Sequence, residues 1–356
     1  MIILNNDNNT KRVVIGLSGG VDSSVAAILL KEKGYNVIGV TMKLLDKEND
    51  SAILDAKKVA DSLGIEFHVL DLQNEFKKYV IDSFAHEYIN GRTPNPCIVC
   101  NKYLKFGLLL TKSKELFNAD YIATGHYARV EYNKDTYRYN VIESDSNGKD
   151  QTYVLYSLTQ EQLKHTLMPL GDYKKEEIRR IAEKHNLITA NKKDSQEICF
   201  VEDNDYAGFI KRNFNYTPKI GEFIDTKGNK YGKHKGIIHY TVGQRRGLGL
   251  SLKSPLYVKS LNPDNNEILL CSKEELESDS LILEDVNWQA IEKPTSPITA
   301  EVKIRYSAPK AMATLIPLED GSVKVVFNDK QRAITPGQAA VFYKGNMLLG
   351  GGIIQK

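Results

Sequence analysis

The stretch VVIGLSGGVDSSVAAILL, residues 13–30, decides the fold of this chain. Residues 13–17 have the length and β-branched content of a buried strand, and this strand stops at a serine and two glycines. Apolar residues then recur at helical spacing until Gly34. The stretch therefore predicts a strand, a glycine turn and a helix. Backbone N–H groups of such a turn can approach a bound anion, which the helix N-terminus also favours.

The turn itself reads SGGVDS, residues 18–23. It lacks the lysine and the spacing of a Walker loop, and it does not match G-x-G-x-x-G. An ordinary strand-to-helix turn would explain a bare pair of glycines. The full string instead resembles the pyrophosphate loop of ATP pyrophosphatases, enzymes that attach AMP to a substrate oxygen and release pyrophosphate.

Length and composition indicate a soluble globular protein. The 356 residues suffice for two or three domains, and 26% of them are charged and 41% hydrophobic. No apolar run reaches the roughly 18 residues that span a bilayer, and residues 1–12 are too polar for a signal peptide. We therefore expect a cytoplasmic protein without a membrane partner.

The basic residues are unevenly distributed. The net charge is only +3, but residues 226–263 contain no Asp or Glu. They include Lys227, Lys230, Lys233, Lys235, Arg245, Arg246, Lys253 and Lys259. A solvated face is one explanation; a block this one-sided favours contact with phosphates.

Strands alternate with helices in the first half of the chain. We expect strands at 13–17, 36–44, 65–72 and 120–127, and helices at 51–63, 75–89, 103–117 and 173–185. This alternation predicts a doubly wound parallel sheet in an α/β domain, residues 1–203. Ligands bind at the carboxyl ends of such strands, which places Met42, Gly125 and His126 near the glycine turn.

Short strands dominate the rest. We expect two at 137–142 and 152–158, and, beyond residue 203, further ones at 236–242, 256–260, 268–270, 299–306, 312–317, 323–327 and 338–343. Helical periodicity fades there. The pattern predicts a small β-rich central domain, residues 204–278, and a C-terminal β-barrel, residues 279–356.

The four cysteines are Cys97, Cys100, Cys199 and Cys271, too few for a disulfide scaffold. Cys97 and Cys100 form a C-x-x-C pair after a stretch whose prolines and glycine prevent regular structure, and we expect both to face the same way across one turn. Thiolates carry sulfur as persulfides, form disulfides or ligate iron. The alternative to such chemistry is that Cys97 and Cys100 are simply two semi-buried thiols. Cys271 is predicted to be a core residue.

Taken jointly, the motifs of the whole chain resemble the bacterial tRNA-specific 2-thiouridylase family, within the PP-loop ATP pyrophosphatases. The matching segments are GLSGGVDSSVAA (16–27), GRTPNPCIVCNK (91–102), ATGHYAR (123–129), KDQTYVL (149–155), DSQEICF (194–200), GQRRGLG (243–249), Arg305-Tyr306 and TPGQA (335–339). The resemblance implies ATP-dependent 2-thiolation of the wobble uridine in tRNAs for Lys, Glu and Gln.

The resemblance also implies residue roles. ATP, with Mg²⁺, would bind Gly16, Leu17, Ser18, Gly19, Gly20, Val21, Asp22, Ser23, Met42 and Gly125. The uridine O2 would attack the α-phosphorus, and sulfur would then displace AMP. In the family's scheme, Cys199 receives sulfur as a persulfide from a relay protein. Cys100 either attacks the persulfide to release sulfide or displaces it directly, so the two thiols must approach each other.

The implied tRNA contacts come from several segments. They are Asn95, Pro96 and Cys97 for the target base, and His126, Lys149, Asp150, Gln151, Arg305, Tyr306 and Gln338 elsewhere. A base undergoing chemistry is unstacked, and tyrosine or arginine can stack on it. Charge alone leads us to add Gln244, Arg245 and Arg246 as backbone contacts in the central domain.

Cys97 departs from the family pattern, since many members have Asp there. Cys97, Cys100 and Cys199 could hold three irons of a [4Fe–4S] cluster whose fourth iron binds sulfide, and we favour this interpretation. Alternatively, Cys97 is an extra resolving thiol. In either case, we expect a sulfur donor as a partner, which is a persulfide relay protein or free sulfide.

Two other functions are compatible with parts of the sequence. A nitrogen-transferring amidotransferase or lysidine-type ligase would use the same loop but leave the cysteines idle. An RNA-binding scaffold would use the basic block and the barrel alone, and an intact SGGVDS argues against it.

Overall fold

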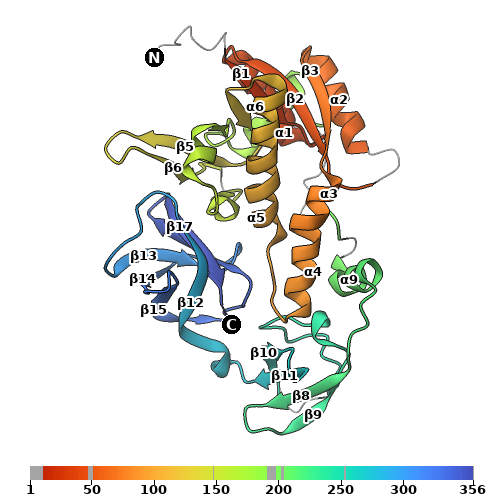
Figure 1. Cartoon of the computed structure of the whole chain (residues 1–356), viewed down its shortest axis with the longest axis vertical. Helices are drawn as coiled ribbons and strands as arrows, with labels where there is room; N and C mark the ends of the chain where they lie inside the picture. The colour runs from red at the N-terminus through yellow and green to blue at the C-terminus, as the bar shows by residue number, and fades with distance from the viewer. Residues whose placement is uncertain are drawn as a thin grey trace.

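The computed structural model describes residues 11–46, 51–146, 148–190, 198–201, 204–251 and 254–355. An α/β unit comes first, a small β-sheet unit follows, and a β-barrel ends the chain (Figure 1). The predicted fold class is confirmed. Residues 194–197 of the predicted DSQEICF motif lie outside the described residues.

Five parallel strands form the N-terminal sheet in the order β3-β2-β1-β4-β7. They are β1 (Arg12–Gly16), β2 (Asn36–Lys43), β3 (Glu66–Asp71), β4 (Tyr121–Ala123) and β7 (Thr166–Leu167). The chain moves from β1 to β2 on one side and returns to β4 on the other. The carboxyl end of β1 is thus a topological switch point, where ligands of open α/β sheets bind.

Both faces of this sheet are covered because residues of β1 point alternately to opposite sides. Val14 lies in one core with Leu109 of α6, whereas Val13 and Ile15 share another with Ile178 of α8. The helices of the unit are α1 (Val21–Glu32), α2 (Ser51–Leu63), α3 (Gln73–Phe76), α4 (Asp82–Ile89), α5 (Pro96–Cys100), α6 (Leu109–Phe117), α7 (Gln160–Lys164) and α8 (Lys175–Lys184).

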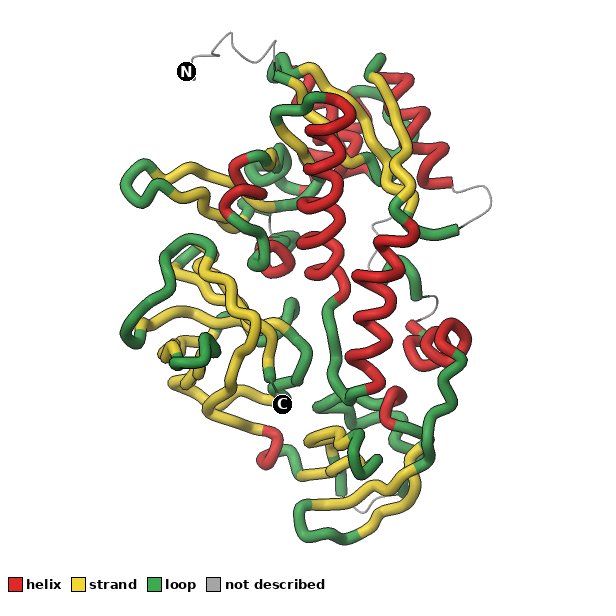
Figure 2. The backbone as a smooth tube through the Cα atoms, in the orientation of Figure 1, coloured by secondary structure: helices red, strands yellow, loops and turns green. Residues whose placement is uncertain are grey.

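Two long helical rods are each built from three segments (Figure 2). The π-helical stretch η2 (Lys77–Ile81) joins α3 to α4, and η3 (Asn101–Leu108) joins α5 to α6. The second rod begins earlier than the predicted residue 103, because Asn95 caps it and Pro96 occupies its first turn.

Three other expectations were wrong. Residues 152–158 and 236–242 are not strands but contain the short 3₁₀ helices η4 (Thr152–Leu155) and η6 (Ile237–His239). Short apolar runs are compatible with either structure, so periodicity does not separate them. Helical structure also continues past residue 203, as α9 (Tyr206–Phe214), whose cap Asp205 accepts from the Gly208 N–H.

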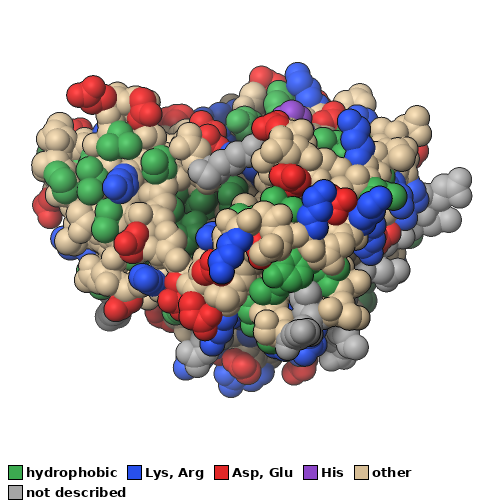
Figure 3. Space-filling model, turned by 90° about the horizontal axis from the view of Figure 1, so that it is seen from below, with side chains coloured by type: hydrophobic (Ala, Val, Ile, Leu, Met, Phe, Trp, Pro, Cys, Tyr) green, Lys and Arg blue, Asp and Glu red, His purple; other side chains and the backbone are tan. Residues whose placement is uncertain are grey.

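The central unit contains a four-stranded sheet in the order β10-β11-β8-β9. Its strands are β8 (Gly221–Asp225), β9 (Lys230–His234), β10 (Tyr257–Asn262) and β11 (Glu267–Cys271). Cys271 is buried, as predicted. Arg245 and Arg246 are exposed. Seen from below, lysines and arginines are interspersed with acidic side chains around a central hollow (Figure 3).

Six strands close the C-terminal barrel. They are β12 (Glu277–Trp288), β13 (Ile298–Lys303), β14 (Ala311–Pro317), β15 (Val323–Arg332), β16 (Ala339–Lys344) and β17 (Met347–Ile354), with the 3₁₀ turn η7 (Glu274–Leu276) before them. Closure comes from pairing of β12 with β17. The hairpin of β5 (Ala128–Asn133) and β6 (Arg138–Glu143) also pairs with β17, so the N-terminal unit extends the barrel sheet.

The segment between α4 and α5 touches all three units. Gly91 lies against Leu261 of β10. The Arg92 guanidinium pairs with Glu87 at 2.7 Å and with Glu284 of β12 at 2.5 Å. The helix that carries Cys97 and Cys100 is therefore anchored at its start by both C-terminal units.

Candidate active site

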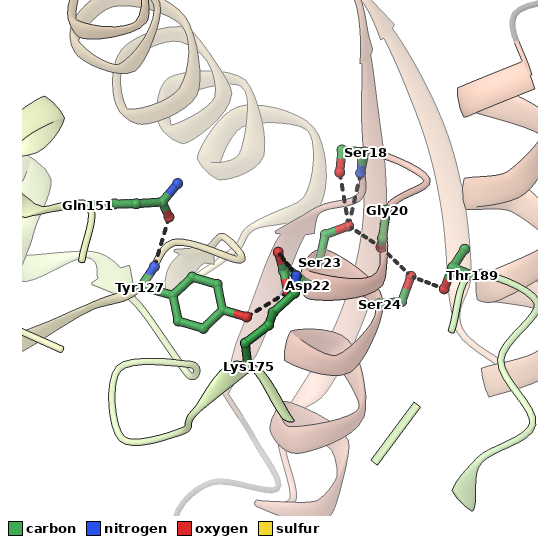
Figure 4. A network of polar contacts seen from close by, with 9 residues as sticks. All are labelled: Ser18, Gly20, Asp22, Ser23, Ser24, Tyr127, Gln151, Lys175 and Thr189. Carbon is green, nitrogen blue, oxygen red and sulfur yellow. Dashed lines mark hydrogen bonds and ion pairs between the residues drawn. The ribbon is translucent and has the colours of Figure 1, made fainter. Parts of the chain in front are cut away.

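The SGGVDS loop joins β1 to α1 and is held by its own serines (Figure 4). The Ser18 N–H donates to the Ser23 Oγ at 3.1 Å, and the two hydroxyl oxygens lie 3.2 Å apart. The Ser24 hydroxyl donates to the Gly20 carbonyl at 2.8 Å. Gly20 is the N-cap of α1, and glycine has no side chain to cover the N–H groups of the first turn. These groups favour an anion.

Two glycines allow close backbone approach at this loop. Gly19 has φ +67°, and a Cβ there would lie 2.5 Å from the Ala52 carbonyl oxygen. A Cβ on Gly125 would lie 2.7 Å from the Ser23 nitrogen. The structure thus brings Gly125 against the loop. Half-buried Met42 lies in β2, two residues beyond Val40, whose carbonyl accepts from the Leu17 N–H just before the loop.

Asp22 is the centre of a polar network at this loop (Figure 4). The Lys175 ammonium contacts its carboxylate oxygens at 2.8 and 2.9 Å, and the Tyr127 hydroxyl donates to Oδ1 at 2.7 Å. Tyr127 is held in turn, because its N–H donates to the Gln151 side chain at 2.9 Å. Lys175 begins α8, far from the loop in sequence.

The three predicted sulfur-carrying cysteines come together beside the second rod. Cys97 is exposed in the first turn of α5 and Cys100 is buried at its end, three residues later and therefore on the same side of the helix. Cys199 is close enough for its pKa to respond to both. The neighbouring Phe200 anchors it, with its ring centroid 5.2 Å from that of Phe84.

Burial controls the acidity of these thiols. It raises the pKa of Cys100, which nearby Lys105 lowers and Cys97 raises. Cys199 is exposed, but crowding by neighbouring atoms and the two other cysteines raise its pKa to about 11. Both thiols are protonated at neutral pH in this arrangement. A proton must therefore leave before either attacks as a thiolate.

Three segments assigned to tRNA contacts converge near Cys97. The Tyr306 hydroxyl donates to the Asp150 carbonyl at 3.0 Å, and the Asp150 carboxylate accepts from the Thr152 hydroxyl at 2.7 Å. Burial, Asp150 and Cys97 raise the pKa of Tyr306. Tyr306 as a whole remains 44% exposed, and a partly exposed tyrosine here can stack on a base.

Two other residues assigned to tRNA make protein contacts. Gln338 donates its amide to the Thr93 carbonyl at 2.7 Å, immediately before the Asn95–Cys97 segment. His126 is buried, with its Nδ1 2.8 Å from the Thr124 hydroxyl, and burial and Lys105 hold its pKa well below 6.5. In this structure Gln338 holds the backbone at Thr93, and His126 contacts the side chain of Thr124 inside the protein.

Comparison with known proteins gives matches along the chain. A model described as the tRNA methyl transferase HUP domain matches residues 11–203, its PRC-barrel domain matches 207–272, and an aminomethyltransferase beta-barrel domain matches 278–354. A protein of Clostridium botulinum called tRNA-specific 2-thiouridylase MnmA is 52% identical, over 97% of this chain and 98% of its own. The chain belongs to the tRNA-specific 2-thiouridylase family.

Proteins with the same name from other organisms are equally similar. That of Acetivibrio thermocellus is 51% identical, and that of Clostridium kluyveri is 53% identical, each over 97% of this chain and 99% of its own. The descriptions of the matching family models mention methyl transferases, whereas these relatives are called thiouridylases. The grouped cysteines of this 2-thiouridylase family member agree with the relatives' name.

Several residues of the site were not predicted from the sequence. Lys175 sits in a helix of mixed charges that looked like a solvated face, and no local motif marks it. Tyr127 follows the ATGH string, so its position at the sheet edge was the available signal. Lys105 lies five residues after Cys100, where the i→i+5 pattern of η3 brings it back over that residue.

Metal binding by the cysteines has no support from the geometry. Within the described ranges, no three His, Cys, Asp or Glu side chains are grouped so that they could hold a metal ion. Nor is any helix in that part of the chain both long and apolar enough to cross a bilayer.

Proposed function

We propose that this protein is an ATP-dependent tRNA sulfurtransferase that replaces O2 of the wobble uridine with sulfur, in tRNAs of the Lys, Glu and Gln type, in the cytoplasm. One observation carries the proposal. The loop of an ATP pyrophosphatase and a group of thiols lie in the same α/β unit, and the residues between them are close to both. Gly125 lies against the loop, and, besides burial, the charge of Lys105 affects the pKa of both the adjacent His126 and Cys100, so Lys105 lies near each of them.

Membership of a PP-loop family implies ATP and Mg²⁺. The donors at the loop fit a hard cation, since the Asp22 carboxylate and the serine hydroxyls are oxygen ligands. Bound there, Mg²⁺ would offset the negative charge of the phosphates. The protein's own part is to orient the phosphates by the N–H groups of the loop and of the first turn of α1.

In the first half-reaction, the uridine O2 attacks the α-phosphorus of ATP and pyrophosphate leaves. The product is an O-adenylated base, in which C2 has become an electrophile and AMP a leaving group. Asn95, Pro96 and Cys97 would hold the flipped base, with Tyr306 stacked beside it. Lys149, Asp150, Gln151 and Arg305 would grip the flanking nucleotides, and Gln244, Arg245 and Arg246 the backbone.

In the second half-reaction, a persulfide on Cys199 supplies the sulfur. Its terminal sulfur attacks C2 and AMP departs, leaving the base joined to Cys199 through two sulfurs. The Cys100 thiolate then attacks the Cys199 sulfur, which releases 2-thiouridine and forms a Cys100–Cys199 disulfide. Alternatively, Cys100 attacks first and the released hydrosulfide attacks C2. Either order consumes one persulfide and requires a two-electron reductant to restore both thiols.

A [4Fe–4S] cluster on Cys97, Cys100 and Cys199 is the alternative sulfur route. Their arrangement does not fit it, as no such metal group occurs in the described residues, so we derive no step through it. Iron and acid-labile sulfide in anaerobically reconstituted protein separate the routes. Negligible iron supports the persulfide route, whereas about four of each per chain would establish the cluster.

Nucleoside analysis tests the function. Protein, ATP, Mg²⁺ and an unmodified tRNA-Glu transcript are incubated with sulfide or with a persulfide donor, and the digested tRNA is examined by mass spectrometry. We expect 2-thiouridine at the wobble position, only when ATP is present. A methylated uridine, or unmodified tRNA with both donors, would contradict the proposal.

A further inference from the structure

The thiol of Cys97 has no chemical step in the reaction proposed above. Cys199 carries the sulfur and Cys100 resolves the intermediate, so each turnover ends with these two residues joined in a disulfide. Cys97 is the second residue of α5, the helix that ends at Cys100. A third thiol is therefore present on the element that carries the buried half of this disulfide.

Cys97 and Cys100 differ in their access to solvent. They lie three residues apart in α5, so their side chains project from the same side of the helix. Cys97 is exposed. Cys100 is only 7% exposed and packs in a core that includes Phe84 and Leu104. A reagent in solution therefore reaches this pair through Cys97.

A disulfide within this pair needs little movement. Cβ atoms three residues apart on a helix are separated by about 5–6 Å, and a disulfide brings them to about 3.5–4.5 Å. The bond therefore closes with a movement of about 1–2 Å. The first turn can supply it, because the Cys97 N–H donates to the Asn95 side chain, at 3.1 Å, and not to a helical carbonyl.

Cys199 lies beside the same pair. Its neighbour Phe200 packs in the core that contains Cys100. Burial, and then Cys100 and Cys97, raise the pKa of the Cys199 thiol. A disulfide between Cys100 and Cys199 would therefore form next to the Cys97 thiol.

We propose that Cys97 and Cys100 form a dithiol–disulfide pair that regenerates the Cys199 thiol after each sulfur transfer. The proposal rests on the function proposed above. Once 2-thiouridine has left, the Cys97 thiolate attacks the Cys100 sulfur of the Cys100–Cys199 disulfide. The Cys97–Cys100 bond forms and the Cys100–Cys199 bond breaks. Cys199 leaves as a thiolate and takes up the proton that Cys97 released, so this exchange is redox-neutral.

Two electrons enter in a second exchange, from a dithiol reductant. One thiol of the reductant attacks the exposed Cys97 sulfur, and Cys100 leaves as a thiolate. The second thiol of the reductant then displaces Cys97 and closes the reductant's own disulfide. The two protons of the reductant pass to Cys97 and Cys100. The buried Cys100 sulfur is thus reduced without being reached from solvent.

Disulfide mapping after a single turnover tests the exchange. Protein is loaded with glutathione persulfide, freed of glutathione and mixed with ATP, Mg²⁺ and a tRNA-Glu transcript in the absence of reductant. Acid quenching, alkylation and peptide mass spectrometry then locate the disulfide. We expect a Cys97–Cys100 disulfide and a free Cys199 in the wild type, and a Cys100–Cys199 disulfide in Cys97→Ser. A wild-type disulfide that stays between Cys100 and Cys199 would overturn the proposal.

Counting 2-thiouridine in the same samples separates this test from that of the proposed function. If none forms, one equivalent of diamide supplies the oxidation in place of the turnover, and the same disulfides are mapped. Dithiothreitol should then reduce the wild-type disulfide at least about tenfold faster than that of Cys97→Ser. Equal reduction rates would also contradict the proposal. Cys271→Ser, which removes a buried thiol of the central unit, is the control and should behave as the wild type.

Discussion

Gln338 of the C-terminal barrel donates a hydrogen bond to the Thr93 carbonyl of the N-terminal unit at 2.7 Å. Beside it, the Thr93 N–H donates to the Pro336 carbonyl at 2.8 Å. These two bonds fix the backbone two residues before Asn95. The barrel thereby positions the segment that we assign to the target base.

Replacing Gln338 by Ala should loosen this segment without touching the ATP site. Misplacement of a catalytic segment by about 1 Å costs up to about 100-fold in rate, and we expect 2-thiouridine formation to fall by about tenfold or more. ATP affinity, measured by calorimetry, should stay within about twofold of wild type. Gln331→Ala, a glutamine of β15 in the same barrel, is the control. Equal activity of both variants would refute the positioning role.

Thiol reactivity should follow burial. Because the pKa of Cys199 is raised to about 11, its thiolate is scarce at neutral pH and increases about tenfold per pH unit up to that value. Alkylation of Cys199 by iodoacetamide, followed by peptide mass spectrometry, should therefore accelerate steadily between pH 7 and pH 10. Buried Cys100 should react last, and exposed Cys97 is the internal comparison. A rate for Cys199 that levels off near pH 8 would contradict this.

A methyl group on Gly125 should damage the ATP site. The Cβ of alanine would lie 2.7 Å from the Ser23 nitrogen and would push the start of α1 away. We expect Gly125→Ala to weaken ATP binding by more than about tenfold. Thermal melting in the absence of nucleotide controls for misfolding. Normal ATP affinity in this variant would mean that the β4 edge and the loop are not in contact.

Buried His126 should make stability depend on pH. Its pKa is lowered in the folded protein, mainly by burial, so below about pH 6.5 the unfolded chain binds a proton that the folded one does not. The free energy of unfolding should fall as pH drops through this range, by up to about 1.4 kcal/mol per pH unit. Above about pH 7 this contribution is constant.

The variant His126→Asn removes the titrating group and keeps a polar side chain near Thr124. Urea unfolding at pH 7.5, 6.5 and 5.5 should show a smaller loss of stability in the variant than in the wild type. Identical pH profiles would place His126 in contact with solvent, where its pKa is ordinary.

Local structure was predictable from the sequence. The strand, glycine turn and helix of residues 13–30 follow from adjacent residues, and β1 and α1 lie where expected. Pairings over long distances were not. Lys175 meets Asp22 only because α8 packs on α1, and nothing in KKEE marks that lysine. Gln338 was identified by its resemblance, but its partner Thr93 required the fold.

The secondary-structure predictions were wrong where a strand and a helix would be equally buried. Residues Thr152–Leu155 are buried all round and rich in β-branched and aromatic types, which suits a core strand, yet they form a 3₁₀ turn. The start of α5 was hidden by the prolines before Cys97. Pro96 in the first turn favours a helix that its neighbours in sequence seemed to exclude.

In the proposed reaction, one ATP is cleaved to AMP and pyrophosphate for each sulfur inserted, and the cysteines are needed only for the second half-reaction. The most direct test is to count AMP, pyrophosphate and 2-thiouridine in one tRNA reaction, with wild type and with Cys100→Ser and Cys199→Ser. We expect equal amounts of all three from the wild type with a persulfide donor. The serine variants should release pyrophosphate in a tRNA-dependent way but form no 2-thiouridine. Thiolation without pyrophosphate release, or undiminished thiolation by both variants, would contradict the account.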